Sequence, residues 1–161
     1  MTVVVLELAL IEAAHLTDLV EQFAALVGET PAAEDPAVAR LVPDAYADDE
    51  AAAREFRELT ERELLSRRGE DAAAVLESLR HDGARLSPGA VDPALATTAF
   101  TITLDADEIG AWLRTLAALR LVLASRLGIA SEDDHDPDDP RFGVYEWVGH
   151  RLDGLVRAID G

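Results

Sequence analysis

The chain has 161 residues, of which 32 are acidic and 14 basic, giving a net charge of −18 with 49% hydrophobic residues. The high hydrophobic content excludes a disordered acidic tail, and the negative charge argues against binding to nucleic-acid phosphates or to an anionic membrane surface. Cysteine and lysine are absent, which excludes disulfides, thiolate nucleophiles, cysteine metal sites and Schiff-base lysines.

The first half of the chain predicts one strand and several helices. Residues 3–8 are rich in β-branched side chains, as expected of a short strand. Apolar residues then recur at helical spacing over 10–27, and Gly28 is a plausible end of that helix. A loop with three prolines follows, at Pro31, Pro36 and Pro43.

Residues 44–80 predict three shorter helical pieces. Asp44 or Asp48 can cap the first, which ends near Leu59. Thr60 and Glu63 have the spacing of a capping box, so a fresh helical turn is expected to start there and to end near Gly69. A third short helix is predicted over 71–80, followed by a long loop rich in glycine and proline.

The second half begins with a strand over 98–104, where apolar residues alternate with threonine. Asp105 or Asp107 can cap the helix that follows, expected to be the longest of the chain and to end at Gly128. An acidic loop over 131–140 holds six acids and no base. The last helix is expected to begin near Pro140, with Asp139 as its cap.

These elements predict a mainly α fold. We expect a single-domain helical bundle over 1–161, with about five or six helices and a small two-stranded sheet of strands near 3–8 and 98–104. The two strands should pair, because each alone would leave its backbone groups unpaired, but their relative direction is open.

An internal echo links the two halves at a constant offset of 96 residues. It suggests two equivalent strand–helix units, although any two helices that follow strands share such a pattern. The matched positions are Leu8, Glu12, Ala13, Leu16, Val20 and Phe23 in the first half, and Leu104, Glu108, Ile109, Trp112, Leu116 and Leu119 in the second.

No membrane segment or signal peptide is predicted. The apolar stretch at 3–6 has no basic residues before it and is interrupted by Glu7. The longest apolar stretch, 116–127, contains two arginines and is too short to span a bilayer. We therefore expect a cytoplasmic protein.

Candidate metal ligands are weak. Asp134, Asp136 and Asp138 alternate as in a calcium-binding loop, but the glycine and the final glutamate of that motif are out of place. The alternative is a solvated acidic loop. His81 and Asp82 form a lone His-Asp dipeptide without a further ligand set, and no cofactor is expected.

Two residues on the predicted helices call for a packing partner. Arg120 lies in the most apolar stretch of the chain, so its guanidinium should pair with an acid on a neighbouring helix, with Glu146 and Asp44 as candidates. Gly149 lies inside the last helix, where the close approach of another helix is the usual compensation for its cost.

Several segments together resemble one protein family over nearly the whole chain. They are RLVPDAYADD at 40–49, EFRELT at 55–60, LRLVLASRLG at 119–128, and DPDDP with VYEWVG ending at Gly149. As a set they resemble DUF2017, an actinobacterial family of domains of unknown function. His150 and Arg151 depart from the neutral residues expected there, which puts a binding role for that face in doubt.

The resemblance implies no established activity and no catalytic residues. It implies an association with regulated proteolysis, because some members look to be encoded near the adaptor that delivers substrates to the Clp protease. The label of transcriptional regulator that some members carry fits poorly with the charge of this chain. Candidates for partner or ligand contacts within the segments are Arg40, Asp44, Tyr46, Arg120, Glu146 and Trp147.

Three functions remain open. The first is a non-catalytic interaction or regulatory protein that binds a protein partner through its acidic surface and one apolar groove. The second is a metal-dependent hydrolase that uses carboxylates such as Asp44, Asp48, Asp49 and Glu55, together with Glu58. The third is a homodimer whose interface is its function.

Overall fold

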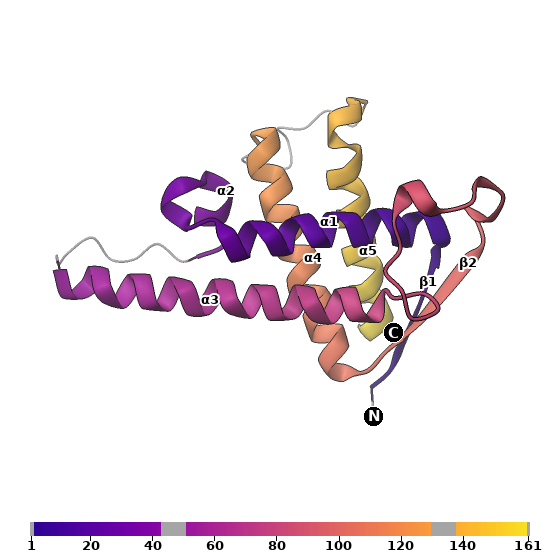
Figure 1. Cartoon of the computed structure of the whole chain (residues 1–161), viewed down its shortest axis with the longest axis horizontal. Helices are drawn as coiled ribbons and strands as arrows, with labels where there is room; N and C mark the ends of the chain where they lie inside the picture. Colours follow the sequence, from indigo (N-terminus) through magenta and orange to yellow (C-terminus); the bar gives the residue numbers. More distant parts are fainter. Residues whose placement is uncertain (1, 43–50, 130–137, 161) are drawn as a thin grey trace.

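The computed structural model describes residues 2–42, 51–129 and 138–160. Two strands and five α-helices make up most of these residues (Figure 1). The prediction of a mainly α fold with a small two-stranded sheet is confirmed. The elements are β1 (Val4–Ala9), α1 (Leu10–Glu29), α2 (Pro36–Ala39), α3 (Ala51–Ser78), β2 (Ala99–Leu104), α4 (Ala106–Leu127) and α5 (Gly143–Asp160).

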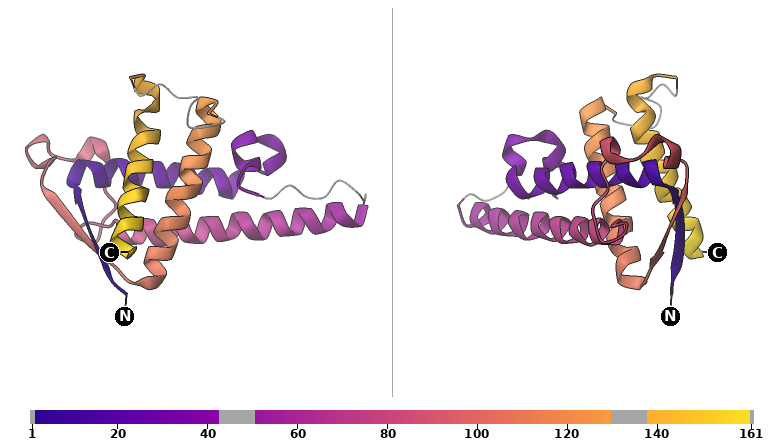
Figure 2. Two further views of the ribbon diagram at one scale, coloured as in Figure 1. Left: turned by 180° about the vertical axis from the view of Figure 1, so that it is seen from behind. Right: turned by 45° about the vertical axis from the view of Figure 1, so that its right-hand side comes forward.

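The long helices form two crossed pairs. α1 lies beside α3, and α4 lies beside α5, with the second pair running across the first (Figures 1 and 2). The sheet of β1 and β2 lies toward one end of the α1–α3 pair, next to α5 (Figure 2). The N-terminal half of α3 extends in the opposite direction, beyond α1 and α4 (Figure 1).

The two strands pair in antiparallel, from Val4 opposite Leu104 to Ala9 opposite Ala99. Alternate side chains face the core, so Val4 and Leu8 are buried while Val5 is 62% exposed. The sequence left the direction of pairing open. Because the strands are antiparallel, α1 leaves one end of the ribbon and α4 leaves the other.

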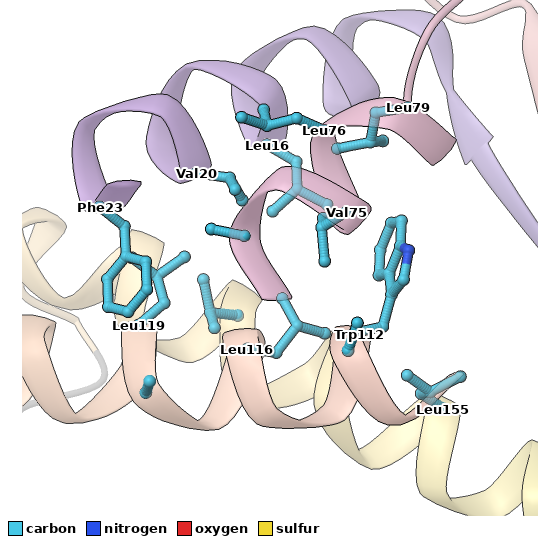
Figure 3. Close-up of a cluster of buried hydrophobic side chains, with 14 of the residues drawn as sticks. Leu16, Val20, Phe23, Val75, Leu76, Leu79, Trp112, Leu116, Leu119 and Leu155 are labelled. Atoms are coloured by element: carbon cyan, nitrogen blue, oxygen red, sulfur yellow. The ribbon is translucent and has the colours of Figure 1, made fainter. Parts of the chain in front are cut away.

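One core joins all four long helices (Figure 3). Its centre is built from aliphatic side chains together with Phe23 and Trp112, and each fully buried leucine contributes about 1.5–3 kcal/mol of transfer free energy. The Trp112 Nε1–H donates a hydrogen bond of 2.7 Å to Ser78 Oγ, which satisfies the polar group of this ring. The labelled side chains come from α1 (Leu16, Val20, Phe23), α3 (Val75, Leu76, Leu79), α4 (Trp112, Leu116, Leu119) and α5 (Leu155).

α4 is capped at its two ends by residues that the sequence predicted, Asp105 and Gly128. The Asp105 carboxylate accepts the Glu108 N–H at 2.9 Å, and Glu108 Oε1 accepts the Asp105 N–H at 3.1 Å, which completes a capping box. At the other end Gly128 adopts a left-handed conformation, with φ of 73°.

The region predicted as three short helices is a single helix, α3, where it is described. Thr60 does not cap a new turn, because its hydroxyl donates to the Phe56 carbonyl at 2.8 Å inside the helix. Gly69 is likewise an interior residue of α3 and not a stop. With 28 residues α3 is also longer than α4, which has 22, so the prediction that the helix after Asp105 is the longest was wrong.

Smaller differences lie at other boundaries. α1 continues through Gly28 to Glu29, and the Thr30 N–H bonds to the Leu26 carbonyl. The loop predicted after it contains the short helix α2, which begins because the Asp35 carboxylate accepts the Ala37 N–H at 2.8 Å. Pro140 begins a 3-10 turn, Pro140–Phe142, and α5 follows from Gly143.

The internal echo corresponds to equivalent places in the fold. Leu6 pairs with Ile102, its own counterpart at the offset of 96, so the sheet contains a matched pair. The same offset relates the first residues of α1 and α4, Leu10 and Ala106. The matched core positions of both helices, from Ala13 to Phe23 and from Ile109 to Leu119, are all buried. The interpretation of two equivalent strand–helix units therefore fits the structure.

Candidate functional site

A shallow groove lies between one face of α1 and the first turns of α5. Its volume is about 370 Å³, and apolar side chains provide most of its lining. The α1 residues at positions 11, 15, 18 and 19 follow helical spacing, which places them on one face. The lining residues are Ile11, Glu12, His15, Asp18, Leu19, Gly143, Val144 and Trp147.

Glu12 links the two walls of the groove. Its Oε2 accepts the Trp147 Nε1–H at 2.9 Å and the Arg151 Nε–H at 3.2 Å. Its Oε1 accepts the backbone N–H of Ala9 at 3.2 Å. One carboxylate therefore joins the end of β1 and the start of α1 to two consecutive turns of α5.

The pKa of Glu12 is lowered. Partial burial of the carboxyl raises the pKa, but the hydrogen bonds from Arg151 and Trp147, the Ala9 N–H and the positive charge of Arg151 together outweigh that effect. Glu12 is therefore ionised at neutral pH, and its charge is held by Arg151. This pair fixes the Trp147 indole at the edge of the groove.

The open side of the groove carries both apolar and polar exposed side chains. Val144 on α5 is 43% exposed although it is apolar. His15 and Asp18 on α1 are exposed and lie one turn apart. The Asp18 carboxylate, at the rim of the groove, accepts a hydrogen bond from Gln22 at 2.9 Å. The groove thus offers an apolar floor beside acidic surface.

Of the residues predicted for partner contacts, Trp147 lies in this groove. Arg40 is exposed at the end of α2 and does not line it. Asp44 and Tyr46 lie outside the described residues. Glu146, the neighbour of Trp147, is half-buried on α5.

Arg120 lies at the α4–α5 interface. Its guanidinium carbon is 4.8 Å from the centre of the Tyr145 ring, a cation–π distance. Its Nε is buried without a hydrogen-bond partner among the described residues. A side chain at Gly149 would meet this group, because a Cβ built there lies 3.1 Å from Arg120 Nε. The glycine inside α5 therefore makes room for an arginine from α4.

Of the carboxylates predicted for metal binding, the structure describes Glu55, Glu58 and Asp138, and these belong to no group that could hold a metal ion. Glu55 and Glu58 are exposed on the projecting part of α3, whereas Asp48 and Asp49 lie outside the described residues. Asp138 is exposed before α5, and its predicted companions Asp134 and Asp136, with most of the 131–140 loop, are also outside. Within residues 2–42, 51–129 and 138–160, no group of three or more His, Asp or Glu side chains could hold a metal ion.

Sequence reasoning missed Glu12 as a site residue and set Arg151 aside. Glu12 has the position of an ordinary acidic residue in a first helical turn, and Arg151 lies 139 residues away in the chain. The only signal was the departure of Arg151 from the neutral residue expected at that position. In the structure this departure supplies the cation that holds Glu12.

The helices described here do not include one that is both long and apolar enough to cross a bilayer. A family model described as "Domain of unknown function (DUF2017)" matches residues 2–159. The chain therefore belongs to this family, as its sequence segments indicated. Comparison with curated proteins and with solved structures finds no match.

Proposed function

We propose that this chain is a non-catalytic cytoplasmic protein that binds a protein partner through the groove between α1 and α5. The observation that carries the proposal is the groove itself, where exposed Val144 and the fixed Trp147 face Ile11 and Leu19. Tryptophan is a frequent anchor of binding energy in interfaces, especially when its orientation is held before binding.

The charge of the molecule indicates the chemistry of the partner. At −18 the chain attracts basic segments and repels acidic ones, and Asp18 places one of these charges at the rim. Glu12 is already neutralised by Arg151, so it positions Trp147 and is not available as a free charge. The groove suits a segment with an apolar side chain that enters between the helices and basic residues on either side.

We propose further that this partner belongs to a system of regulated proteolysis. The support is the association with regulated proteolysis that the family resemblance implies. A role as adaptor or regulator also requires no catalytic residues. An adaptor or regulator acts by holding one protein near another, which a groove and a charged surface can do.

The experiment compares two matched variants of α5. Val144 and Val156 are 43% and 42% exposed, but only Val144 lines the groove. Val144→Gln and Val156→Gln remove equal apolar surface and leave the net charge unchanged. Immobilised wild type and both variants are exposed to a native lysate of the source organism at low and high salt, and retained proteins are identified by mass spectrometry.

The expected result is a protein retained by the wild type and by Val156→Gln but reduced about tenfold on Val144→Gln. Its retention should fall at high salt, because screening weakens attraction between opposite charges. The purified partner should then bind the wild type and Val156→Gln with similar affinity, and Val144→Gln more weakly. If no protein distinguishes the two variants, the groove is not the binding site.

A further inference from the structure

The N-terminal part of α3 projects beyond the rest of the described molecule (Figures 1 and 2). Packing of α3 begins at Glu61, whose carboxylate accepts the Ala32 N–H at 2.7 Å, and at Leu65, which is buried. Before that point Phe56 and Leu59 are 71% and 53% exposed. Phe56 is the most exposed large apolar side chain among the described residues.

Phe56 and Leu59 belong to one surface. Residues three apart lie on the same face of a helix, so the two side chains form an exposed apolar pair, here called the α3 stripe. Single exposed apolar residues are ordinary, but helices gain most of their stability in water from packing of an apolar face. An exposed phenylalanine and an exposed leucine on one face of a helix therefore indicate a contact that the described residues of a single chain do not make.

The charge around the stripe indicates which molecule makes that contact. Residues 54–70 hold five arginines and five glutamates, so this segment is neutral and the charge of −18 belongs to the remainder. Two copies of the chain repel each other through acidic surface, and this repulsion is least where the charges balance. A basic partner would prefer the acidic surface, and an acidic partner would be repelled by the whole molecule.

We propose that two copies of this chain associate through their α3 stripes, around a two-fold axis that places Phe56 and Leu59 of one copy against those of the other. A two-fold interface uses the same patch twice, so the patch must complement itself. An apolar pair flanked by both signs of charge meets that requirement. Ten residues of helix span about 15 Å, which predicts a weak, concentration-dependent dimer and not an obligate one.

The test is sedimentation equilibrium of the full chain from about 1 to 500 μM, at about 0.05 and 0.5 M NaCl. The dimer fraction should rise with concentration and also with salt, because screening reduces repulsion between two acidic molecules while apolar contact remains. This salt response is opposite to that expected for the groove, so failure of either proposal can be recognised separately.

Phe56→Asp with Leu59→Asp should raise the dissociation constant roughly 100-fold. The control is Leu95→Asp, since Leu95 is 51% exposed in the turn Pro93–Leu95, outside the α3 stripe. Far-UV circular dichroism and thermal unfolding verify that each variant is folded. Arg62→Glu leaves the stripe intact but makes the segment acidic, so it should weaken the dimer roughly tenfold at low salt and less at high salt.

A monomer at every concentration would overturn the proposal, as would a dimer that weakens with salt. An equal effect of Leu95→Asp and the α3 double variant would also overturn it. Because the chain has no cysteine, Leu59→Cys and Leu95→Cys each introduce a single thiol for a short bis-maleimide linker. Covalent dimer is expected from the first variant and not from the second.

Discussion

The two strand–helix units, β1–α1 and β2–α4, bury the same matched positions but begin their helices by different means. α4 begins with its own side chains, since Asp105 and Glu108 cap each other. α1 follows Ala9, which has no side chain that can cap. Instead the N–H groups of Leu10 and Ile11 bond to the carbonyls of Thr98 and Ala96, at 2.9 and 3.0 Å.

This difference separates local from tertiary information. The start of α4 is encoded within four residues, whereas the start of α1 requires a segment almost 90 positions further along the chain. Glu12 repeats the contrast, because it bonds to Trp147 and Arg151 in addition to Ala9, while its counterpart Glu108 bonds to Asp105. The first unit is therefore the one whose geometry, and whose groove, depends on the rest of the fold.

The largest expected loss of stability comes from substitutions in the core, and these test whether the two units share one core. Trp112→Ala should lower the free energy of unfolding by about 3–5 kcal/mol, and Leu16→Ala, at the matched position, by about 2–4 kcal/mol, since each leaves a cavity. Both variants should unfold in a single transition, observed by urea denaturation with circular dichroism. Two separate transitions would show that the units are independent.

A smaller loss of stability is expected from substitution of the two matched glutamates, Glu12 and Glu108. Glu12→Gln should cost about 1–2 kcal/mol at neutral pH, because it removes charged hydrogen bonds to α5, whereas Glu108→Gln should cost less than about 0.5 kcal/mol, because an amide can still complete the capping box. Urea denaturation at several pH values measures both.

The pH dependence has a definite sign. The pKa of Glu12 is lowered in the folded state, because the Arg151 and Trp147 hydrogen bonds outweigh the opposing effect of burial, which is the largest single contribution. Its stabilisation is therefore complete above the ordinary pKa near 4.5 and is lost as pH falls through the lowered value. The difference between wild type and Glu12→Gln should shrink below about pH 4.5. A constant difference down to pH 2–3 would contradict this role of the charge.

The smallest effects are expected at the two caps. Asp105→Ala should cost about 1 kcal/mol and release the first amides of α4 to faster hydrogen exchange. Ala9→Ser should stabilise the protein by less than the roughly 1 kcal/mol typical of an N-cap, because the Ile11 amide, one of the two that a serine there could cap, already has a partner. A gain near 1 kcal/mol from the serine would show that the backbone contacts to 96–98 contribute little.

Much of the fold could be predicted because its signals are local. β-branched residues identified the first strand, alternation identified the second, and Asp105 and Gly128 identified the ends of α4. The continuity of α3 could not be predicted, since a threonine followed three residues later by a glutamate reads as a helix start. Only the structure shows the Thr60 hydroxyl bonded to the carbonyl of Phe56.

The candidate site was less predictable than the fold. Trp147 was expected to contact a partner, but its own anchor is Glu12, which lies 135 residues earlier in the chain. Nothing local distinguishes this glutamate from the other acids. The exposure of the α3 stripe was equally hidden, because apolar residues at helical spacing usually face a core.

The register of β1 against β2, in which Leu6 pairs with Ile102, sets the positions of the helices that follow each strand. A register slip of two residues would keep the alternation of side chains but slide one strand about 7 Å along the other, more than the pitch of an α-helix. Since α1 and α4 continue directly from opposite ends of the ribbon, such a slip would carry them past each other and separate every layer of side chains between them. Six residue pairs thus set the alignment of a core many times their size.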